Sequence, residues 1–578
     1  MKKFVYVAII LAFVSGFWIA VTLLTRAIQL NKYDHSLRIV ASKISSQLSD
    51  EQLVQQAFIF FVKLDNSDDI SSLLPGALFL NKLNLPKEKN GSDDLFKLHE
   101  QMEVIHNIYM EKNVPPPIFT IDQEWGYIRR LQKDFTDFPS AMALGEAVEE
   151  TDHYHLAMLQ GFYTCLELRK NGIQWPFIPV ADVQTNPNNP VIGVRSFGSK
   201  PEVVTKITQE FILGMQTARC MGTMKHFPGH GDTSLDSHRN LPVVNRELTE
   251  LEKSELYPYK TILTSDDPPY SIMSAHIVFS KLSPEPATLS KFWLEEKLKT
   301  EWAYKGLVIT DDLEMNAVII YGSQNGISDI PLEAFLSGVD MLLLLTNREK
   351  SERAVKNLLS YISKHPDAKS RLIRAVEKVL FYKLKMGTLD RYLVDTKIEW
   401  NKDERKAINM ILAYSLEQEE NIRSIEGQLA TAESVNNFLS EHAIKTLVNP
   451  SGKKGFSYEN ILYTDLPKTD PAFLLLSENK VKTFPMSKIQ NADCANACVI
   501  LHVGKYSLRN VLRMKGSQPV VIFSVADPFP ARKYLPLFGP NDIFITSFSN
   551  TDTSVKALVN SYLKRKLPPK AAVIYNYN

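Results

Sequence analysis

One short segment concentrates most of the residues that could perform acid–base chemistry. The segment KHFPGHGDTSLDSHRNLPVV, residues 225–244, holds three histidines and two aspartates: His226, His230, Asp232, Asp236 and His238. Gly229 and Gly231 interrupt it, and glycine permits sharp turns and positive φ angles. A solvated polar loop explains one or two such histidines, but not a dense set that follows a strand. The composition therefore predicts a shaped functional loop.

Asp236 and His238 are two positions apart in this loop. In an extended segment, residues i and i+2 project to the same side, so the carboxylate can hydrogen-bond the imidazole. Such a contact fixes the tautomer and raises the pKa of a histidine above its ordinary value of ~6.5. The pair can donate a proton to a leaving oxygen and then accept one from water. The spacing predicts an acid–base dyad.

A second pair of carboxylates ends the strand-like run VITDDLEM, residues 308–315. Neighbours on a strand face opposite sides, so Asp311 and Asp312 cannot point the same way, and one can enter the pocket while the other makes a structural bond. We expect Asp311 to face the site and Asp312 to cap the following turn.

A fold must bring these residues together, and the hydrophobic pattern between residues 55 and 350 indicates which one. Amphipathic helical stretches such as 201–220 separate buried apolar runs, a pattern typical of a parallel sheet. The runs occupy 57–62, 116–122, 173–183, 223–229, 271–279, 307–312 and 341–347. Seven visible repeats favour an eight-stranded barrel with one irregular unit over an open sheet. In a barrel, the carboxyl ends of all strands meet at one face, where active sites are built. Polar residues stand at or near these ends: Asp122, Asp182, Lys225 with His226, His276 and Asp311.

The segments around the barrel are assigned more coarsely. Residues 30–50 are expected to form a polar amphipathic stalk, a helix near 367–386 closes the barrel, and 387–405 serve as a linker. From 406 to 578 the pattern is again α/β, with strands at 444–450, 497–503, 518–525 and 542–548. That part has no cluster of catalytic side chains, which favours an accessory or packing domain. The predicted fold class is an α/β protein, a (β/α)8 TIM-type barrel at 30–395 followed by a smaller α/β domain at 406–578.

The N-terminus carries a targeting pattern. Lys2 and Lys3 precede an uncharged run from Phe4 to Leu24, which Arg26 ends. About 20 apolar residues cross a bilayer as a helix, and no small-x-small cleavage site follows. The pattern at 1–29 favours an uncleaved signal anchor over a cleaved signal peptide. The positive-inside tendency then places the remaining chain at the periplasmic or extracellular face, anchored in the cytoplasmic membrane by residues 4–24.

Composition excludes some classes of protein. Lys and Arg number 66 and Asp and Glu 65 among 578 residues, so no global field attracts nucleic acid. Four cysteines are too few for a disulfide scaffold. Cys165 and Cys220 fall in helical patterns and are expected to be buried thiols. Cys494 and Cys498 either bridge or remain free.

With these residues in view, the chain resembles glycoside hydrolase family 3, and within it the β-N-acetylglucosaminidase branch. The resemblance runs from about residue 50 to 390. It rests on IDQEWG (121–126) with Arg130, PVADVQTNPNNPVIGVRSFG (179–198), KHFPGHGDTSLDSH (225–238), MSAHIVF (273–279), PATLS (286–290) and KGLVITDDLEM (305–315). The Asp-x-His pair in the loop is the most specific block, because other branches take a Glu acid/base from elsewhere.

The resemblance implies a role for each matching position. Asp311 becomes the nucleophile, His238 the acid/base, and Asp236 the partner that orients His238. The sugar-binding positions are Asp122, Arg130, Arg195, Lys225 and His226. The implied activity is a retaining exo-β-N-acetylglucosaminidase acting on peptidoglycan fragments or chitooligosaccharides, with neither metal nor cofactor. A covalent glycosyl-enzyme intermediate is expected for such a mechanism.

Two departures and three alternatives stay open. The family usually has Glu-Gly-Gly where this chain has Glu124-Trp125-Gly126, so Trp125 either stacks on a sugar or narrows the pocket. Relatives in this branch often work in the cytoplasm, which makes export the second departure. The alternatives are a zinc hydrolase, a glycan-binding protein on an inactive barrel, and a family 3 phosphorylase or other β-glycosidase. The oligomeric state is not determined by the sequence.

Overall fold

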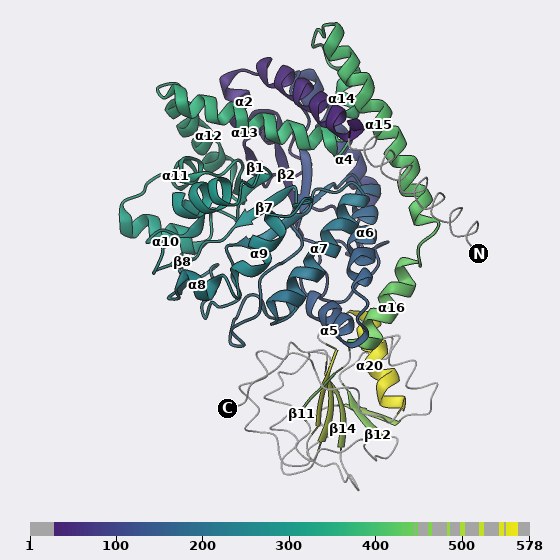
Figure 1. Cartoon of the computed structure of the whole chain (residues 1–578). Coiled ribbons are helices and arrows are strands. Elements are labelled where there is room, and N and C mark those ends of the chain that lie inside the picture. Colours follow the sequence, from purple (N-terminus) through teal and green to yellow (C-terminus); the bar gives the residue numbers. More distant parts are fainter. Residues whose placement is uncertain are drawn as a thin grey trace, which may run out of the picture.

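The computed structural model describes residues 28–443 and, further on, 445–448, 461–464, 482–485, 498–502, 520–524, 543–547, 549 and 551–564. A large helix-covered barrel forms one part, and a smaller sheet flanked by helices forms the other (Figure 1). The predicted targeting run at 4–24 and Cys494 lie outside the described residues. Within the described part of the chain, no helix is both long and apolar enough to cross a bilayer.

Eight parallel strands close the barrel, as the sequence predicts. They are β1 (Phe58–Phe60), β2 (Ala77–Leu80), β3 (Ile118–Ile121), β4 (Trp175–Pro176), β5 (Thr223–Phe227), β7 (Ser271–Ser274), β9 (Leu307–Thr310) and β10 (Leu342–Leu344). Pairing runs from β10 through β1, β2 and β3 to β4, and from β5 through β7 to β9. Parallel bridges between Val180 and Lys225, and between Ile309 and Met341, join the two sets into a ring. The irregular unit is β4, which has two residues.

The eighth strand, missing from the predicted set, is β2. Its four residues are all buried and follow a helix that ends at an αL residue, Leu74. Asparagine and serine caps begin several of the barrel's helices: the side chains of Ser140, Asn66 and Asn347 accept backbone N–H groups at the first turns of α5, α3 and α12.

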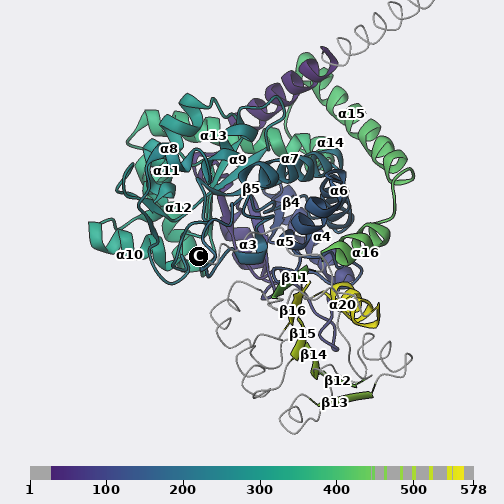
Figure 2. The same cartoon turned by 60° about the horizontal axis from the view of Figure 1, so that its bottom comes forward.

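Helices surround the barrel between successive strands (Figures 1 and 2). They are α2 (Asp50–Gln56), α3 (Ser67–Leu73), α4 (Leu95–Glu111), α5 (Ala141–Thr151), α6 (His155–Lys170), α7 (Pro201–Thr217), α8 (Leu248–Leu251), α9 (Leu256–Leu263), a π-helix (Phe292–Glu301), α10 (Asn316–Asn325), α11 (Ile330–Ser337), α12 (Arg348–Ile362) and α13 (Pro366–Lys385). Short pieces complete this part: the 3₁₀ turns Gly193–Arg195 and Ala287–Leu289, and the paired strands β6 (Val243–Val244) and β8 (Val278–Phe279).

The expected stalk at 30–50 is wrong. Residues 28–46 form a helix whose apolar side is buried in the common hydrophobic core, through residues that include Leu37, Val40 and Ile44. Tyr33 stacks on Tyr414 with ring centroids 3.9 Å apart. Spacings of three and four residues give a helix one apolar stripe, and here that stripe meets the barrel and α15 rather than solvent.

The expected linker at 387–405 is also largely helical. It contains α14 (Asp390–Asp395), whose Tyr392 is fully buried, and the first turn of α15 (Lys402–Glu426), which Asn401 and Glu404 cap reciprocally. Helix α15 has 25 residues and therefore extends about 37 Å at 1.5 Å per residue. It leads from the 28–46 helix along the barrel to α16 (Figure 2).

The C-terminal domain is α/β, as predicted. It comprises α16 (Ala432–His442), α20 (Asp552–Lys564) and a six-stranded sheet in the order β11, β16, β15, β14, β12, β13. The strands are β11 (Lys445–Val448), β12 (Ile461–Thr464), β13 (Lys482–Pro485), β14 (Cys498–His502), β15 (Val520–Ser524) and β16 (Ile543–Thr546). Only β11 is antiparallel to its neighbour.

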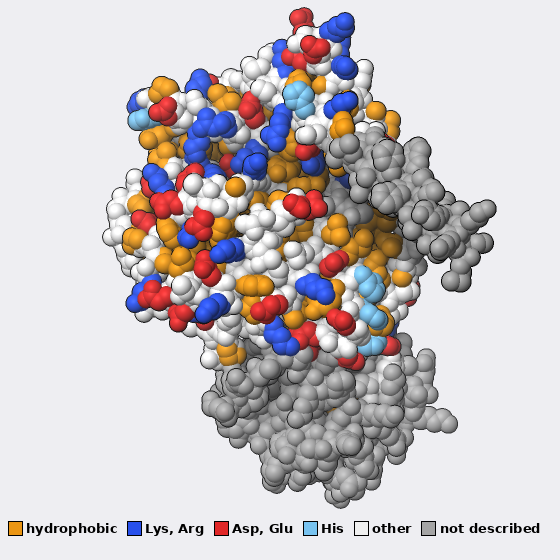
Figure 3. All heavy atoms as spheres, in the orientation of Figure 1, with side chains coloured by type: hydrophobic (Ala, Val, Ile, Leu, Met, Phe, Trp, Pro, Cys, Tyr) orange, Lys and Arg blue, Asp and Glu red, His pale blue; other side chains and the backbone are white. Residues whose placement is uncertain are grey.

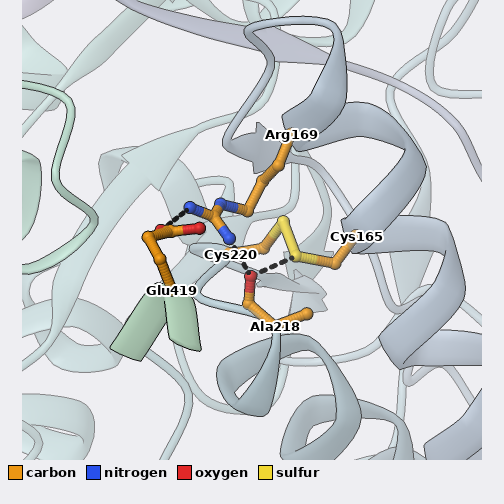
Figure 4. Close-up of a disulfide and its surroundings, with 5 residues drawn as sticks. All are labelled: Cys165, Arg169, Ala218, Cys220 and Glu419. Carbon is orange, nitrogen blue, oxygen red and sulfur yellow. Dashed lines mark hydrogen bonds and ion pairs between the residues drawn. A yellow bond between two sulfur atoms is a disulfide. The ribbon is translucent and has the colours of Figure 1, made fainter. Parts of the chain in front are cut away.

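The prediction of free thiols at Cys165 and Cys220 is wrong, because these residues form a disulfide. Cys220 lies beyond the end of α7, in the turn that leads to β5, so the bond ties this turn to α6 (Figure 4). Arg169 donates to the carbonyl oxygen of Ala218 in the same turn and pairs with Glu419 of α15. Arg219 also pairs with Glu419. The disulfide is thus part of a buried joint between the barrel and α15.

Candidate active site

A cavity of about 210 Å³ lies where the carboxyl ends of the barrel strands meet. Seven of the eight predicted site residues line it: Asp122, Arg130, Arg195, Lys225, His226, His238 and Asp311. The eighth, Asp236, stands behind His238. Apolar side chains form part of the wall, from residues Phe79, Phe177, Val191, Met273, Met315, Leu343 and Leu345. Asn81, Ser237, His230 and Asp312 complete the lining.

Asp311 follows β9 directly, with its backbone N–H donating to Ser274 at the end of β7. Burial alone would raise its pKa, but the charges of His226 and His276 and the N–H of Asp312 outweigh burial and bring the pKa to about 2. The carboxylate is therefore ionised at any ordinary pH. An ionised oxygen at the floor of a cavity is suited to attack on an electrophilic carbon.

The loop after β5 brings Asp236 and His238 together. Oδ1 of Asp236 accepts the backbone N–H of His238 and lies 2.9 Å from its Nδ1. The pKa of Asp236 is lowered because these hydrogen bonds outweigh the effect of partial burial. His238 keeps 63% of its side chain exposed and lines the cavity. With Nδ1 held by the carboxylate, Nε2 is the nitrogen available for proton transfer.

Asp182 holds the same loop in place through hydrogen bonds. This carboxylate is fully buried and accepts the backbone N–H groups of His226 and His230. Its Oδ2 also lies 2.7 Å from Nδ1 of His226, so the carboxylate fixes the orientation of that ring through Nδ1. The sequence pattern places Asp182 at a strand end, but gives it no role.

His230 fastens the loop and contacts the cavity only at its edge. Its Nδ1 lies 2.9 Å from Thr233 Oγ1 and its Nε2 lies 2.9 Å from Ser237 Oγ. Burial, and then the neighbouring His226, lower the pKa of His230 to about 4. Gly231 makes this fold possible, since a Cβ there would lie 1.6 Å from the carbonyl oxygen of Val183. The expected shaped loop is therefore built on a buried neutral histidine and a close backbone approach.

The polar side of the cavity is an ion network centred on Glu124, which the sequence reasoning did not assign. Glu124 binds Arg195 through two hydrogen bonds of 2.7 and 2.9 Å and Lys225 at 2.6 Å. Burial would raise the pKa of Glu124, but these two cations hold it well below its usual range. Lys225 also contacts Asp122 at 2.9 Å, and Arg130 lies 3.9 Å from the second Asp122 oxygen. Glu124 stands two residues after Asp122 in IDQEWG, and this position is the sequence signal from which it could have been found.

Trp125 does not face the cavity, so neither expected role for it holds. Its φ is +68°, in the region that favours glycine, and its side chain is buried against α6. The indole N–H donates to Thr164 Oγ1 at 2.7 Å. The ring meets Phe138 edge-on. The departure from Glu-Gly-Gly therefore changes the packing behind the site and leaves the cavity wall unaltered.

Asp312 makes the turn-capping contact that its position predicts, and it also makes a contact to the segment after β10. Its Oδ1 accepts the N–H of Glu314 and also that of Leu345, which follows β10. Burial, and to a lesser extent the adjacent Asp311, raise its pKa to about 6. Among the residues that the structure describes, no group of three or more His, Cys, Asp or Glu side chains is arranged to hold a metal ion.

A parallel barrel with a hydrogen-bonded Asp–His pair and a buried carboxylate at the carboxyl ends of its strands has the layout of an enzyme. Residues 63–381 match the glycosyl hydrolase family 3 N-terminal domain. Curated β-hexosaminidases are similar to this chain. That of Tolumonas auensis is 35% identical over 233 residues, 40% of this chain and 67% of that protein. That of Nitrosomonas eutropha is 31% identical over 246 residues, 42% of this chain and 69% of that protein.

Similarity in three dimensions extends further along the chain. The family 3 β-N-acetylglucosaminidase of Paenibacillus sp. str. FPU-7 matches with a TM-score of 0.73 and 25% identity, covering 91% of this chain and 100% of that one. The chain belongs to glycosyl hydrolase family 3.

Proposed function

We propose that this protein is a retaining exo-β-N-acetylglucosaminidase that removes a terminal N-acetylglucosamine residue from a β-linked glycan. One observation carries the proposal: His238, backed by Asp236, and the ionised Asp311 line the same cavity. The β-hexosaminidase names of the curated relatives support the sugar assignment. A cavity of about 210 Å³ suits one monosaccharide, which favours release of terminal units.

In the proposed mechanism, Asp311 attacks the anomeric carbon while His238 protonates the departing oxygen. The bond from the anomeric carbon to the leaving oxygen breaks as the bond to the Asp311 carboxylate forms. Water, deprotonated by His238, then displaces Asp311 and restores the starting state with retained configuration. Proton transfer by His238 is typically worth about 10² to 10⁴ in rate, and Asp236 keeps the imidazole oriented through both transfers.

Sugar recognition is assigned to the ion network. Asp122 accepts from hydroxyl groups, while Arg130, Arg195 and Lys225 donate to them. His226 offers Nε2 to a hydroxyl group, since Asp182 occupies its other nitrogen. The apolar wall gives the ring hydrogens and an acetamido methyl group a surface to pack against. Peptidoglycan fragments are the proposed natural substrate and chitooligosaccharides the second choice.

Export, with anchoring by residues 4–24, is part of the proposal. The Cys165–Cys220 disulfide supports it, because structural disulfides form and persist in oxidising compartments outside the cytoplasm. The Lys2-Lys3 and apolar run of the sequence supports it independently. We also assign the catalytic barrel to residues 30–395 and the second domain to 406–578, although α15 spans their boundary.

The test compares aryl β-N-acetylglucosaminide, β-glucoside and β-xyloside as substrates of the wild type and Asp311→Asn. We expect turnover of the first substrate alone, and a loss of about 10³-fold or more in the variant, because the covalent route disappears. Activity of Asp311→Asn equal to the wild type would refute the assignment. Product analysis with and without inorganic phosphate separates a hydrolase from a phosphorylase, since only the latter yields a sugar 1-phosphate.

A further inference from the structure

The connection from β3 to α5 carries two of the proposed sugar-binding residues, Asp122 and Arg130. Between them the chain forms a tight hairpin, in which Glu124 N–H donates to the carbonyl oxygen of Ile128 at 2.8 Å. Gln123 Oε1 accepts the backbone N–H of Arg130 at 2.8 Å. The position of Arg130 therefore depends on how this hairpin is supported.

The hairpin rests on residues 138–140 of the same connection. A Cβ added to Gly126 would lie 2.6 Å from Cβ of Ser140, so the two backbones are in direct contact. On the other side of the hairpin, Trp125 meets Phe138 with ring centroids 5.7 Å apart. Any movement of the 138–140 segment is thereby transmitted to the residues between Asp122 and Arg130.

The C-terminal domain holds this supporting segment at two points. Ser549 Oγ accepts the backbone N–H of Ser140 at 3.2 Å. Three residues upstream, Oδ2 of Asp137 accepts the backbone N–H of Asp552 at 2.9 Å. That N–H belongs to the first turn of α20, where no intrahelical acceptor exists and a carboxylate is favoured by the helix dipole. The other oxygen of Asp137 pairs with Arg129, the neighbour of Arg130.

The part of the interface around Ser549 is closed to solvent. Ser547, Ser549 and Thr551 have no exposed surface. Asn436 of α16 donates to Thr553 of α20 at 3.1 Å. Helix α16 lies against α5, whose N-cap is Ser140, and α20 lies against α16 (Figures 1 and 2). A buried polar interface fixes one arrangement, because each unmade hydrogen bond there costs about 1–3 kcal/mol.

We propose that the C-terminal domain is a working part of the substrate site: through Asp137 and Ser549 it positions the hairpin that presents Arg130 to the sugar. Asp137 is a positioning residue, since it acts through Arg129 and the hairpin and does not line the cavity. The inference rests on the proposed function for its substrate, but the physical linkage from Asp552 to Arg130 can be measured without turnover.

The experiment uses the full chain with Asp137→Ala, and Ser549→Ala as a milder second variant. With 4-nitrophenyl β-N-acetylglucosaminide we expect Asp137→Ala to raise KM by about 3- to 10-fold while kcat stays within about twofold, the signature of lost binding. In an Arg130→Ala background, Asp137→Ala should add almost nothing, because a residue that acts through Arg130 cannot lose the same contact twice. If Asp137→Ala raises KM by the same factor in the Arg130→Ala background as in the wild type, the proposal is wrong.

Hydrogen exchange provides the readout that needs no activity. Amides at 122–131 should exchange faster in Asp137→Ala and Ser549→Ala than in the wild type. Glu103→Gln is the control, since Glu103 pairs with Arg391 in an exposed ion pair away from both domains' contact, and it should change neither KM nor exchange. Unchanged exchange at 122–131 in both variants would overturn the linkage. Failure of the wild type to hydrolyse any N-acetylhexosaminide would instead refute the proposed function.

Discussion

Nδ1 of His238 lies 2.9 Å from Oδ1 of Asp236, and the same oxygen accepts the backbone N–H of His238. One carboxylate oxygen thus fixes both the backbone and the ring of the proposed acid/base. With 63% of its side chain exposed, His238 has little other support. Its orientation therefore depends mainly on Asp236.

Replacing Asp236 should lower activity most on substrates with poor leaving groups. We expect Asp236→Asn to lower kcat/KM on a chitooligosaccharide by about 10- to 100-fold, because the imidazole loses the carboxylate that orients it for proton transfer. Aryl substrates, whose phenol departs without a proton, should lose less. Steady-state kinetics on both substrates gives the comparison. Arg239→Gln is the control, since Arg239 is 83% exposed and 3.9 Å from the same carboxylate; equal losses on both substrates for Asp236→Asn would contradict the role.

Glu124→Gln should impair both stability and binding. Loss of the charge leaves Arg195 and Lys225 buried with an incomplete set of partners, which typically costs about 3–5 kcal/mol. We expect a lower urea midpoint and a KM at least about tenfold higher, since the same two cations are proposed to bind the sugar. Urea unfolding and steady-state kinetics measure the two effects. A variant with wild-type KM would place the network outside the binding site.

The buried His230 predicts an acid-sensitive loop. Its pKa is about 4 in the folded protein, below the ordinary value near ~6.5, so the unfolded chain binds more protons between these limits. Its contribution to stability is therefore present above pH ~6.5 and declines as the pH falls toward 4. The shift corresponds to about 2–3 kcal/mol by pH 4.5. Urea unfolding at pH 7 and 4.5 should give a smaller difference in His230→Asn than in the wild type; identical differences would contradict the assignment.

The disulfide should be a major stabilising element. It closes a loop with a sequence separation of 55, and chain entropy alone predicts about 4 kcal/mol for such a loop. We expect Cys165→Ala combined with Cys220→Ala to lower the urea midpoint, and a reductant to lower it to a similar extent in the wild type. A reductant-insensitive wild type together with an unaltered double variant would show that the bond contributes nothing.

The barrel was predictable because buried parallel strands leave a strong periodic signal, whereas weaker signals were lost. Strand β2 is absent from the predicted runs, and the cavity residue Asn81 that follows it was therefore not predicted. The 28–46 helix shows an apolar stripe, but a stripe does not reveal which surface covers it. The Cys165–Cys220 bond depends on α6 and the turn before β5 being neighbours, a relationship that local patterns do not encode.

The candidate site, like the fold, was predictable only in part. Residues that face the cavity were identified from the family motif and from their places at strand ends. Two residues behind the cavity were given no role, because Asp182 and Glu124 are buried acceptors whose partners are distant in the sequence. The side-chain direction of Trp125 follows from a positive φ, which the sequence alone leaves undetermined.

The family match ends at residue 381, but the smallest piece of this enzyme able to fold by itself must be longer. Helix α15 buries Ile408 and Ile411, and its Glu419 receives both Arg169 and Arg219 from the barrel. A chain shortened at the end of the match would uncover an apolar strip and leave two arginines unneutralised. A shortened form of this protein should therefore keep at least α15, and a swap of catalytic modules between relatives should carry that helix along.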